Sequence, residues 1–316
     1  MGVFGSGLYS GDFALDVRST VSAVARLPYD GDKLIQILCE SEAAAANNPD
    51  DEDHTTFWLV AADRFAKRGI ACERVRDKAL AIIDSGADLA MLGKLGMDPS
   101  GLRKRQKMLL ELRERITAPA APPKPRTALK KPQALLMDVG DVLVYPTFGG
   151  RCRNPYFASS EKDRMGTMAP AWTRDSWSAM VIVDCGRAFD FLAWYRPLTV
   201  SRAMAHKPTV GELRGEVLWR LARPGTCSLV HFRRMGFEKI GVLPIDDDKM
   251  RSAFPGMRPG TRAGVSDIPI ANGISVAPYV PEVLMPKPGE PANYSRGKQY
   301  PTILGIGQIL SGRFVD

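Results

Sequence analysis

The strongest constraint in this sequence is a proline-rich, cationic stretch near its middle. Residues 118–132 contain five prolines and four lysines or arginines, with no acidic residue. Because each proline lacks a backbone donor and the like charges repel one another, this stretch cannot form a helix or a central strand. We predict a semi-extended linker over residues 118–133, rising roughly 3 Å per residue where it is polyproline-like. It would separate a first domain, residues 1–117, from a second, residues 134–316.

The two predicted domains differ in charge. Residues 1–118 carry 16 Lys and Arg against 18 Asp and Glu, whereas residues 135–316 carry 23 against 17. With 316 residues, 45% of them hydrophobic and 25% charged, the chain has the composition of an ordinary globular protein that can bury its own core. The basic second half is compatible with nucleic acid, with an acidic protein partner, or with solubility alone.

The cysteines and histidines indicate reduced thiols and no metal centre. Five cysteines are scattered without any CxxC pair, and the three histidines lie far apart. No stretch approaches the about 18 apolar residues of a membrane span, and the N-terminus lacks the features of a secretory leader. We therefore expect a cytoplasmic protein with no membrane association, no metal and no cofactor.

The first half has the apolar periodicity of helices. Apolar residues recur at intervals of three and four after acidic capping residues, and Asp98-Pro99 is typical of a helix start. Gly69 is placed to end a helix. We predict a compact bundle of five helices, beginning near residues 12, 30, 54, 73 and 98.

Four consecutive carboxylates, residues 50–53, precede the third of these helices. Carboxylates at a helix N-terminus are stabilised by the helix dipole, which explains their position without any function. They could also bind a hard cation, but the segment lacks the glycine and distal glutamate of a calcium loop. If they act, we expect Asp50, Asp51 and Asp53 to form an electrostatic contact surface for a partner.

The glycine-rich start of the chain is expected to lay Tyr9 on the bundle before the first helix. The run Gly5-Ser6-Gly7-Leu8-Tyr9-Ser10-Gly11-Asp12-Phe13-Ala14-Leu15-Asp16 resembles the opening of a bacterial family of uncharacterised small helical proteins, a domain of unknown function. That family typically begins W-G-x-G-x-F-x-x-D-x-A-x-D, and this chain departs from it with Phe4 in place of tryptophan. The resemblance covers residues 2–116 and implies a helical fold and bacterial origin, but no chemistry.

The second half has the pattern of strands. Short apolar runs rich in β-branched and aromatic residues alternate with turn residues, and Cys185-Gly186 is a candidate hairpin loop. A short helix is expected near residues 209–214. We predict strands at 141–146, 177–184, 187–195, 216–221 and 239–243. The predicted fold class is α+β, with an N-terminal helical bundle, the linker, and a small C-terminal antiparallel β-barrel or bent sheet carrying an irregular tail.

The first predicted strand carries a second resemblance. Gly140-Asp141-Val142-Leu143-Val144-Tyr145-Pro146 is similar to the opening strand of β-barrel immunity proteins from bacterial polymorphic toxin systems. The likeness covers residues 138–245 and rests on this one motif. It implies neutralisation of a cognate toxin by stoichiometric protein binding, and it brings no catalytic residues.

Common catalytic motifs are missing from the sequence. There is no G-x-S-x-G elbow and no P-loop, and the glycines near residue 305 lack the rest of a dinucleotide fingerprint. Cys227 and His231 would stand about 13 Å apart in a strand, which disfavours a catalytic dyad. Residues 246–248, three aspartates, are interpreted as a solvated turn. We expect that the protein is not an enzyme.

Cations interleaved with aromatic residues are the best candidates for a binding surface. Arginine with tryptophan and tyrosine is typical of protein-binding hot spots, and the same residues could clamp phosphates while the rings stack on bases. Trp194 and Trp219 lie within apolar runs and are predicted to be core. The remaining candidates for partner binding are Arg151, Arg153, Tyr156, Trp172, Arg174, Arg233 and Arg234.

The sequence therefore supports three functional hypotheses. The first is an immunity or antitoxin-like protein that grips a toxin or other protein partner. The second is an RNA- or DNA-binding module that uses the basic half. The third is an enzyme with a non-standard site between the domains.

Overall fold

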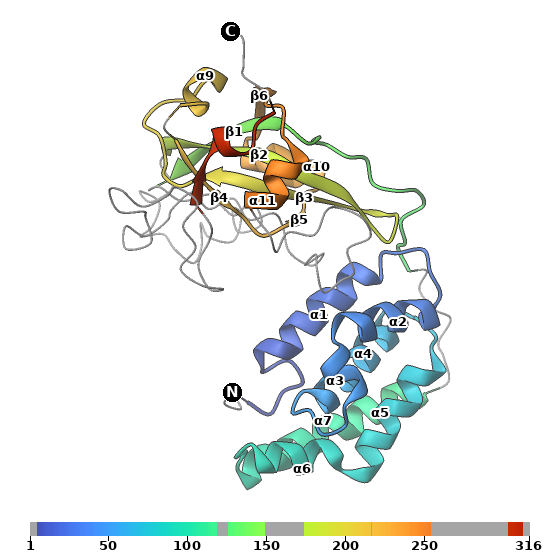
Figure 1. Ribbon diagram of the computed structural model, residues 1–316. Coiled ribbons are helices and arrows are strands. Elements are labelled where there is room, and N and C mark those ends of the chain that lie inside the picture. The colour runs from blue at the N-terminus through green and yellow to red at the C-terminus, as the bar shows by residue number, and fades with distance from the viewer. Residues whose placement is uncertain (1–4, 119–125, 149–173, 216, 254–302, 312–316) are drawn as a thin grey trace. The chain divides into compact units, whose positions relative to one another are not determined.

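The computed structural model describes residues 5–118, 126–148, 174–215, 217–253 and 303–311. Contacts divide the chain into two compact units (Figure 1). Among the described residues, the helical unit comprises the chain up to Gln133 together with the short segment Ala188–Leu192, and the sheet unit comprises the remainder. The succession of helices and then strands confirms the α+β class.

Seven helices form the helical unit in its described residues: α1 Asp12–Val24, α2 Gly31–Ser41, α3 Ala43–Asn47, α4 His54–Lys67, α5 Glu73–Ser85, α6 Ala87–Lys94 and α7 Pro99–Thr117. All five predicted regions are helical. The second, which the sequence predicts from near residue 30 into the alanine run 43–46, is divided, because Glu42 has a non-helical backbone (φ −121°, ψ 53°) that separates α2 from α3. Helix α6 was not predicted.

Helix α4 is the centre of this unit. Helices α1, α3, α5, α6 and α7 pack against it, and ten of its fourteen residues are buried. The predicted capping roles of Asp30 and Asp98 are confirmed, since Asp30 Oδ1 accepts from the Lys33 amide (2.8 Å) and Asp98 Oδ1 from the Gly101 amide (2.6 Å). The predicted cap Asp12 is wrong, because α1 begins after Gly11 without a side-chain cap. Tyr9 contacts the bundle as expected, donating its hydroxyl to Asp63.

A buried ion pair positions α6. Asp88, its only fully buried residue, accepts from Arg105 of α7, with Nε at 2.8 Å and Nη2 at 3.0 Å. Thr55 of α4 donates to the same carboxylate (3.1 Å), and Arg105 Nη1 donates to the Gly7 carbonyl (3.0 Å). This charged cluster joins three helices and the N-terminal segment. Apolar periodicity did not predict α6, because the buried residue that holds this helix against its neighbours is an aspartate and not an apolar residue.

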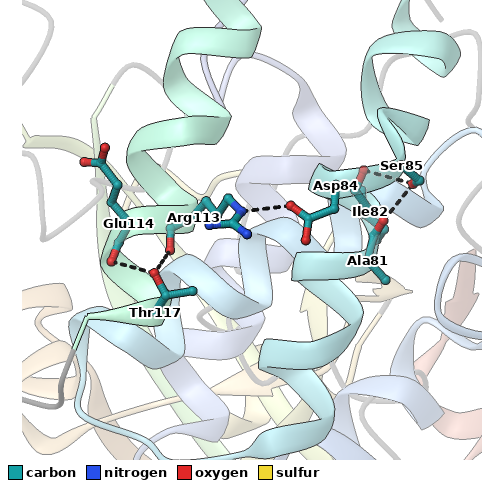
Figure 2. A network of polar contacts seen from close by, with 7 residues as sticks. All are labelled: Ala81, Ile82, Asp84, Ser85, Arg113, Glu114 and Thr117. Atoms are coloured by element: carbon teal, nitrogen blue, oxygen red, sulfur yellow. Dashed lines mark hydrogen bonds and ion pairs between the residues drawn. The ribbon is translucent and has the colours of Figure 1, made fainter.

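An exposed ion pair also links α5 and α7 (Figure 2). Arg113 Nε lies 2.8 Å from Asp84 Oδ1, and both side chains are about half exposed. Beside it, Thr117 Oγ1 donates to the Arg113 carbonyl (2.9 Å) and Ser85 Oγ to the Ala81 carbonyl (2.7 Å). The pair Arg113–Asp84 is thus a solvated counterpart of the buried pair Arg105–Asp88.

The described part of the predicted linker, from residue 126, packs on the helical unit. Arg126 Nη2 donates to the carbonyls of Leu27 (3.0 Å) and Tyr29 (2.6 Å), which follow α1. The Leu129 amide donates to the Arg26 carbonyl (2.7 Å). These bonds satisfy carbonyl groups beyond the end of α1 that have no intrahelical partner.

Seven strands form one sheet in the described part of the chain: β1 Asp141–Phe148, β2 Arg174–Ala188, β3 Leu192–Val200, β4 Leu218–Leu221, β5 Gly225–Thr226, β6 Glu238–Val242 and β7 Ile303–Gly305. The strand order is β6-β1-β2-β3-β4-β7, and β5 also pairs with β3. Of the two predicted alternatives, a small β-barrel or a bent sheet, the barrel does not form in the described residues, because the terminal strands β6 and β7 stand at opposite ends of this order. The alternative, a sheet, is what forms.

The β2–β3 hairpin turns four residues later than predicted. Phe189 and Asp190 both have positive φ (52° and 62°), and the Phe191 amide donates to the Ala188 carbonyl (3.1 Å). Gly186 lies inside β2, where an added Cβ would approach the Trp194 indole to 3.2 Å. The glycine interpreted as a turn signal therefore makes room for a tryptophan.

Both faces of the sheet are covered, and β1 has buried residues on each. Val142, Leu198 and Trp219 belong to one apolar cluster, with residues of α9 (Val210–Leu213), α11 (Asp247–Ala253) and the 3-10 helix η3 (Ile306–Gln308). Leu143 and Tyr195 belong to the other, with Met137 and residues of α10 (Leu229–Met235). Trp194 and Trp219 are core residues, and the helix near residues 209–214 is α9, so these predictions are confirmed.

Two segments predicted as strand or turn are helices. The segment after Cys227, which was predicted to be a strand, is the helix α10. Ser228 Oγ accepts from the His231 amide (3.1 Å) and caps the start of this helix. Asp246 Oδ1 accepts from the amides of Asp248 (3.0 Å) and Lys249 (2.9 Å). The three aspartates therefore cap and begin α11 instead of forming a turn.

Candidate protein-binding surface on helix α10

Helix α10 is a short amphipathic element fixed on one face of the sheet. His231 and Met235 are buried, and Gly236 ends the helix in the left-handed conformation (φ 67°). The Phe237 ring lies 5.6 Å from the Phe232 ring, 5.4 Å from Tyr145 and 6.4 Å from His231. These aromatic contacts hold the inner side of α10 against β1 and restrict its movement.

The outer side of α10 combines aliphatic and cationic side chains. Leu229 is 47% exposed and Val230 is 55% exposed, and Arg233 and Arg234 are also exposed. Each aliphatic residue is followed four positions later by an arginine, so the four side chains share one side of the helix. We call Leu229, Val230, Arg233 and Arg234 the α10 surface.

The sheet edge that follows α10 is charged. Lys239 of β6 lies 2.6 Å from Asp141 Oδ1, and Lys207 lies 2.5 Å from Glu238 Oε1. The pairing of β6 with β1 shifts register between Val142 and Leu143. Charges and an irregular register are features that protect an edge strand from pairing with another chain. We therefore take α10, and not the β6 edge, as the candidate binding surface.

The structure places the predicted binding residues in separate regions. Arg233 and Arg234 lie on α10, whereas Asp50, Asp51 and Asp53 belong to the helical unit. Arg174 is at the start of β2, opposite Phe148. The remaining predicted residues lie outside the described residues: Arg151, Arg153, Tyr156 and Trp172. Sequence reasoning missed Leu229 and Val230, because their spacing from the arginines is meaningful only in a helix.

The acidic cluster is a turn that leads into α4. Asn48 Oδ1 accepts from the Asp50 amide (3.1 Å), and Asp51 Oδ1 accepts from the Asp53 amide (2.9 Å). Burial, followed by the neighbouring Glu52 and Asp51, raises the pKa of Asp53. Within the described residues, no group of three or more His, Cys, Asp or Glu side chains could hold a metal ion.

Several titratable groups in the sheet unit have shifted pKa values, among them Cys227, His231 and Asp184. Burial raises the pKa of Cys227 to about 12, so its thiol stays protonated at neutral pH, and burial lowers the pKa of His231. His231, on the inner side of α10, and Cys227, just before the helix, are therefore neutral groups at pH 7. Burial also raises the pKa of Asp184 in β2 to about 6, although Arg196 opposes the shift. Such a carboxyl could serve as an acid or base near neutral pH.

Comparisons with known proteins do not indicate a function for the α10 surface. Protein-family models, curated proteins and solved structures gave no match to the chain. None of the helices in the described residues has both the length and the apolar composition that crossing a membrane requires. The two resemblances noted in the sequence therefore stay predictions.

Proposed function

We propose that this protein is an immunity or antitoxin-like factor that neutralises a cognate toxin by stoichiometric binding through the α10 surface. The observation that supports it is the pairing of two exposed aliphatic side chains with two arginines on one side of a helix. Arginines beside apolar anchors are enriched where a few residues dominate binding energy. The matching partner surface is acidic and contains an apolar pocket.

The rigid base of α10 supports the same proposal. Its inner side chains are buried against Phe237 and Tyr145, so the outer side chains project from a helix that is already ordered before binding. A preorganised surface loses less conformational entropy on association than a mobile one. A smaller loss of conformational entropy favours the tight binding that stoichiometric neutralisation requires.

Co-expression with the product of the adjacent gene tests the proposal. We expect a complex of fixed stoichiometry on size exclusion and protection of cells from that product. Replacing both arginines (Arg233→Glu with Arg234→Glu) should weaken the complex by at least about tenfold. The matched control is Arg103→Glu with Lys104→Glu, which reverses two adjacent exposed cations on α7. No co-purification, or equal loss in both variants, would refute the proposal.

Nucleic-acid binding is the alternative, since arginines also contact phosphates. The aromatic residues predicted to stack on bases, Tyr156 and Trp172, lie outside the described residues, and Trp194, Tyr195 and Trp219 are buried in the core. The exposed neighbours of Arg233 and Arg234 are aliphatic and offer no ring for a base to stack on. Titration with RNA and DNA across a salt series distinguishes nucleic-acid binding from binding to a protein partner. Binding that weakens steeply with salt and depends on Arg233 would favour this alternative.

A further inference from the structure

Five cations gather around the second half of α4, although the first 118 residues are slightly acidic overall. Arg64, Lys67 and Arg68 belong to α4 or follow its last residue, and two more come from neighbouring helices. Within the described residues, Asp63 is the one carboxylate that contacts any of them. We call this set the α4 cation cluster: Arg18, Arg64, Lys67, Arg68 and Arg115.

Asp63 has no capacity left for most of the cluster. Its buried carboxylate accepts hydrogen bonds from the Tyr9 hydroxyl and from Arg115, and Lys67 Nζ lies 2.8 Å from Oδ2. Two carboxylate oxygens thus already serve three donors. In the described part of the structure, two cations of the cluster contact Asp63, and Arg18, Arg64 and Arg68 do not.

Arg64 and Arg68 are left with unused donors. Arg64 Nη2 donates to Ser22 Oγ of α1 (3.1 Å), but the Nε atoms of Arg64 and Arg68 are buried and have no hydrogen-bond acceptor in the described part of the structure. The two arginines are one helical turn apart. Burial lowers the pKa of Arg68, and the nearby positive charge of Arg64 lowers it further.

Arg18 and Lys67 extend the cluster across the Tyr9 ring. Arg18 Cζ lies 5.1 Å and Lys67 Nζ 5.8 Å from the ring centre. The ring attracts both cations but offers no hydrogen-bond acceptor to their N–H groups. The C-terminal dipole of α4 favours cations at this end, yet it does not supply an acceptor to the buried Nε atoms.

We propose that the α4 cation cluster binds a small phosphorylated anion, with Arg64 and Arg68 as its principal ligands and Arg18 beside them. The planar fork of a guanidinium matches two oxygens of a phosphate group, and neighbouring like charges favour an anion that carries more than one negative charge. A diphosphate group supplies both the acceptors and the charge that Asp63 lacks. This site lies in the helical unit and does not depend on the α10 surface.

Calorimetric titration of the full chain with pyrophosphate, at about 50 mM salt, tests the proposal. We expect one saturable site, with weaker binding of inorganic phosphate. Replacing both principal ligands (Arg64→Gln with Arg68→Gln) should weaken binding by at least about tenfold, since charge-assisted hydrogen bonds are lost. The control is Arg103→Gln with Lys107→Gln, an exposed pair one turn apart on α7, which should bind as the unchanged chain does.

Stability without ligand distinguishes binding from a structural role. Arg68→Gln removes a half-buried cation that faces Arg64, so its unfolding midpoint in the absence of pyrophosphate should equal or exceed that of the unchanged chain. A lower midpoint together with unchanged binding would assign Arg68 to structure. No saturable binding of pyrophosphate, equal loss in the control, or binding of RNA alone would each overturn the proposal.

Discussion

The helical unit and the sheet unit bury their polar groups in different ways. In the helical unit, Asp63 and Asp88 are buried charges, and each is bound by an arginine of α7. In the sheet unit, two apolar layers enclose the strands, and buried Thr147 and Ser178 have hydroxyls without a hydrogen-bond partner among the described residues. The first unit should therefore be sensitive to loss of a charge partner, and the second to loss of side-chain volume.

The largest expected effect comes from separating the buried ion pair. Arg105→Met leaves Asp88 buried without its partner and should destabilise the helical unit by about 3–5 kcal/mol. Hydrogen exchange measured by mass spectrometry would report faster exchange in α6 and α7. Because the two units need not unfold together, exchange resolves them better than a single melting curve.

Two further variants sharpen this prediction. Asp88→Leu combined with Arg105→Met removes both charges and should recover most of the stability, since no unpaired charge stays buried. Arg113→Met breaks only the exposed pair in Figure 2 and should leave exchange unchanged. If Arg105→Met behaved like Arg113→Met, the contrast between the two units would disappear.

Truncation of the sheet core is the next largest effect. Leu198 is fully buried in one apolar layer, so Leu198→Ala should destabilise the sheet unit by about 2–5 kcal/mol. Faster exchange should appear in β3 and β4, with α6 and α7 unaffected. Faster exchange spreading equally into α7 would contradict the division into two separate stability units.

Helix caps should have smaller and similar effects in the two units. Asp98→Ala removes the cap of α7 and Ser228→Ala that of α10, and each should cost about 1 kcal/mol. The readout is the exchange rate of the first-turn amides, including those of Gly101 and His231. Replacement by Asn, which can also cap, should preserve protection at either position.

The last expected effect is a pH dependence of the sheet unit, which comes from one partly buried carboxyl. Burial raises the pKa of Asp184 from 3.8 to about 6 in the folded protein, so the folded state favours the protonated carboxyl. Protonated Asp184 therefore contributes fully to the free energy of unfolding below pH 3.8, and this contribution is lost as the pH rises through about 6. Asp184→Asn keeps the side chain neutral. The variant should match the unchanged chain in urea midpoint near pH 3.5 and exceed it at pH 7. Identical midpoints at both values would show that burial of Asp184 has no energetic consequence.

The predictability of each element follows from which force forms it. Strand β1 was predicted because burial on both faces produces the continuous run Val142 to Tyr145. Helix α6 was missed because the buried residue that holds it in place is the charged Asp88. The hairpin was misplaced because Gly186 makes room for the Trp194 ring and is not a turn residue. Patterns of apolar residues predict apolar contacts and do not report ion pairs.

The candidate surface was predicted in part for a related reason. Arg233 and Arg234 were identified by their chemistry, which needs no knowledge of local structure. Leu229 and Val230 could not be, since a helix of seven residues is too short to show a period and its start depends on one hydroxyl, that of Ser228. Which apolar residues face outward was decided by this local capping bond.

The bond between Arg105 and the Gly7 carbonyl has a consequence for the newly made chain. The two residues are 98 positions apart, and Asp88 lies between them in sequence. At synthesis rates of about 5–20 residues per second, the N-terminal arm waits roughly 5–20 s before its anchor exists. Until α7 is made, Asp88 stays hydrated and α6 lacks the ion pair that holds it, so the last described helix of this unit is the one that anchors Gly7.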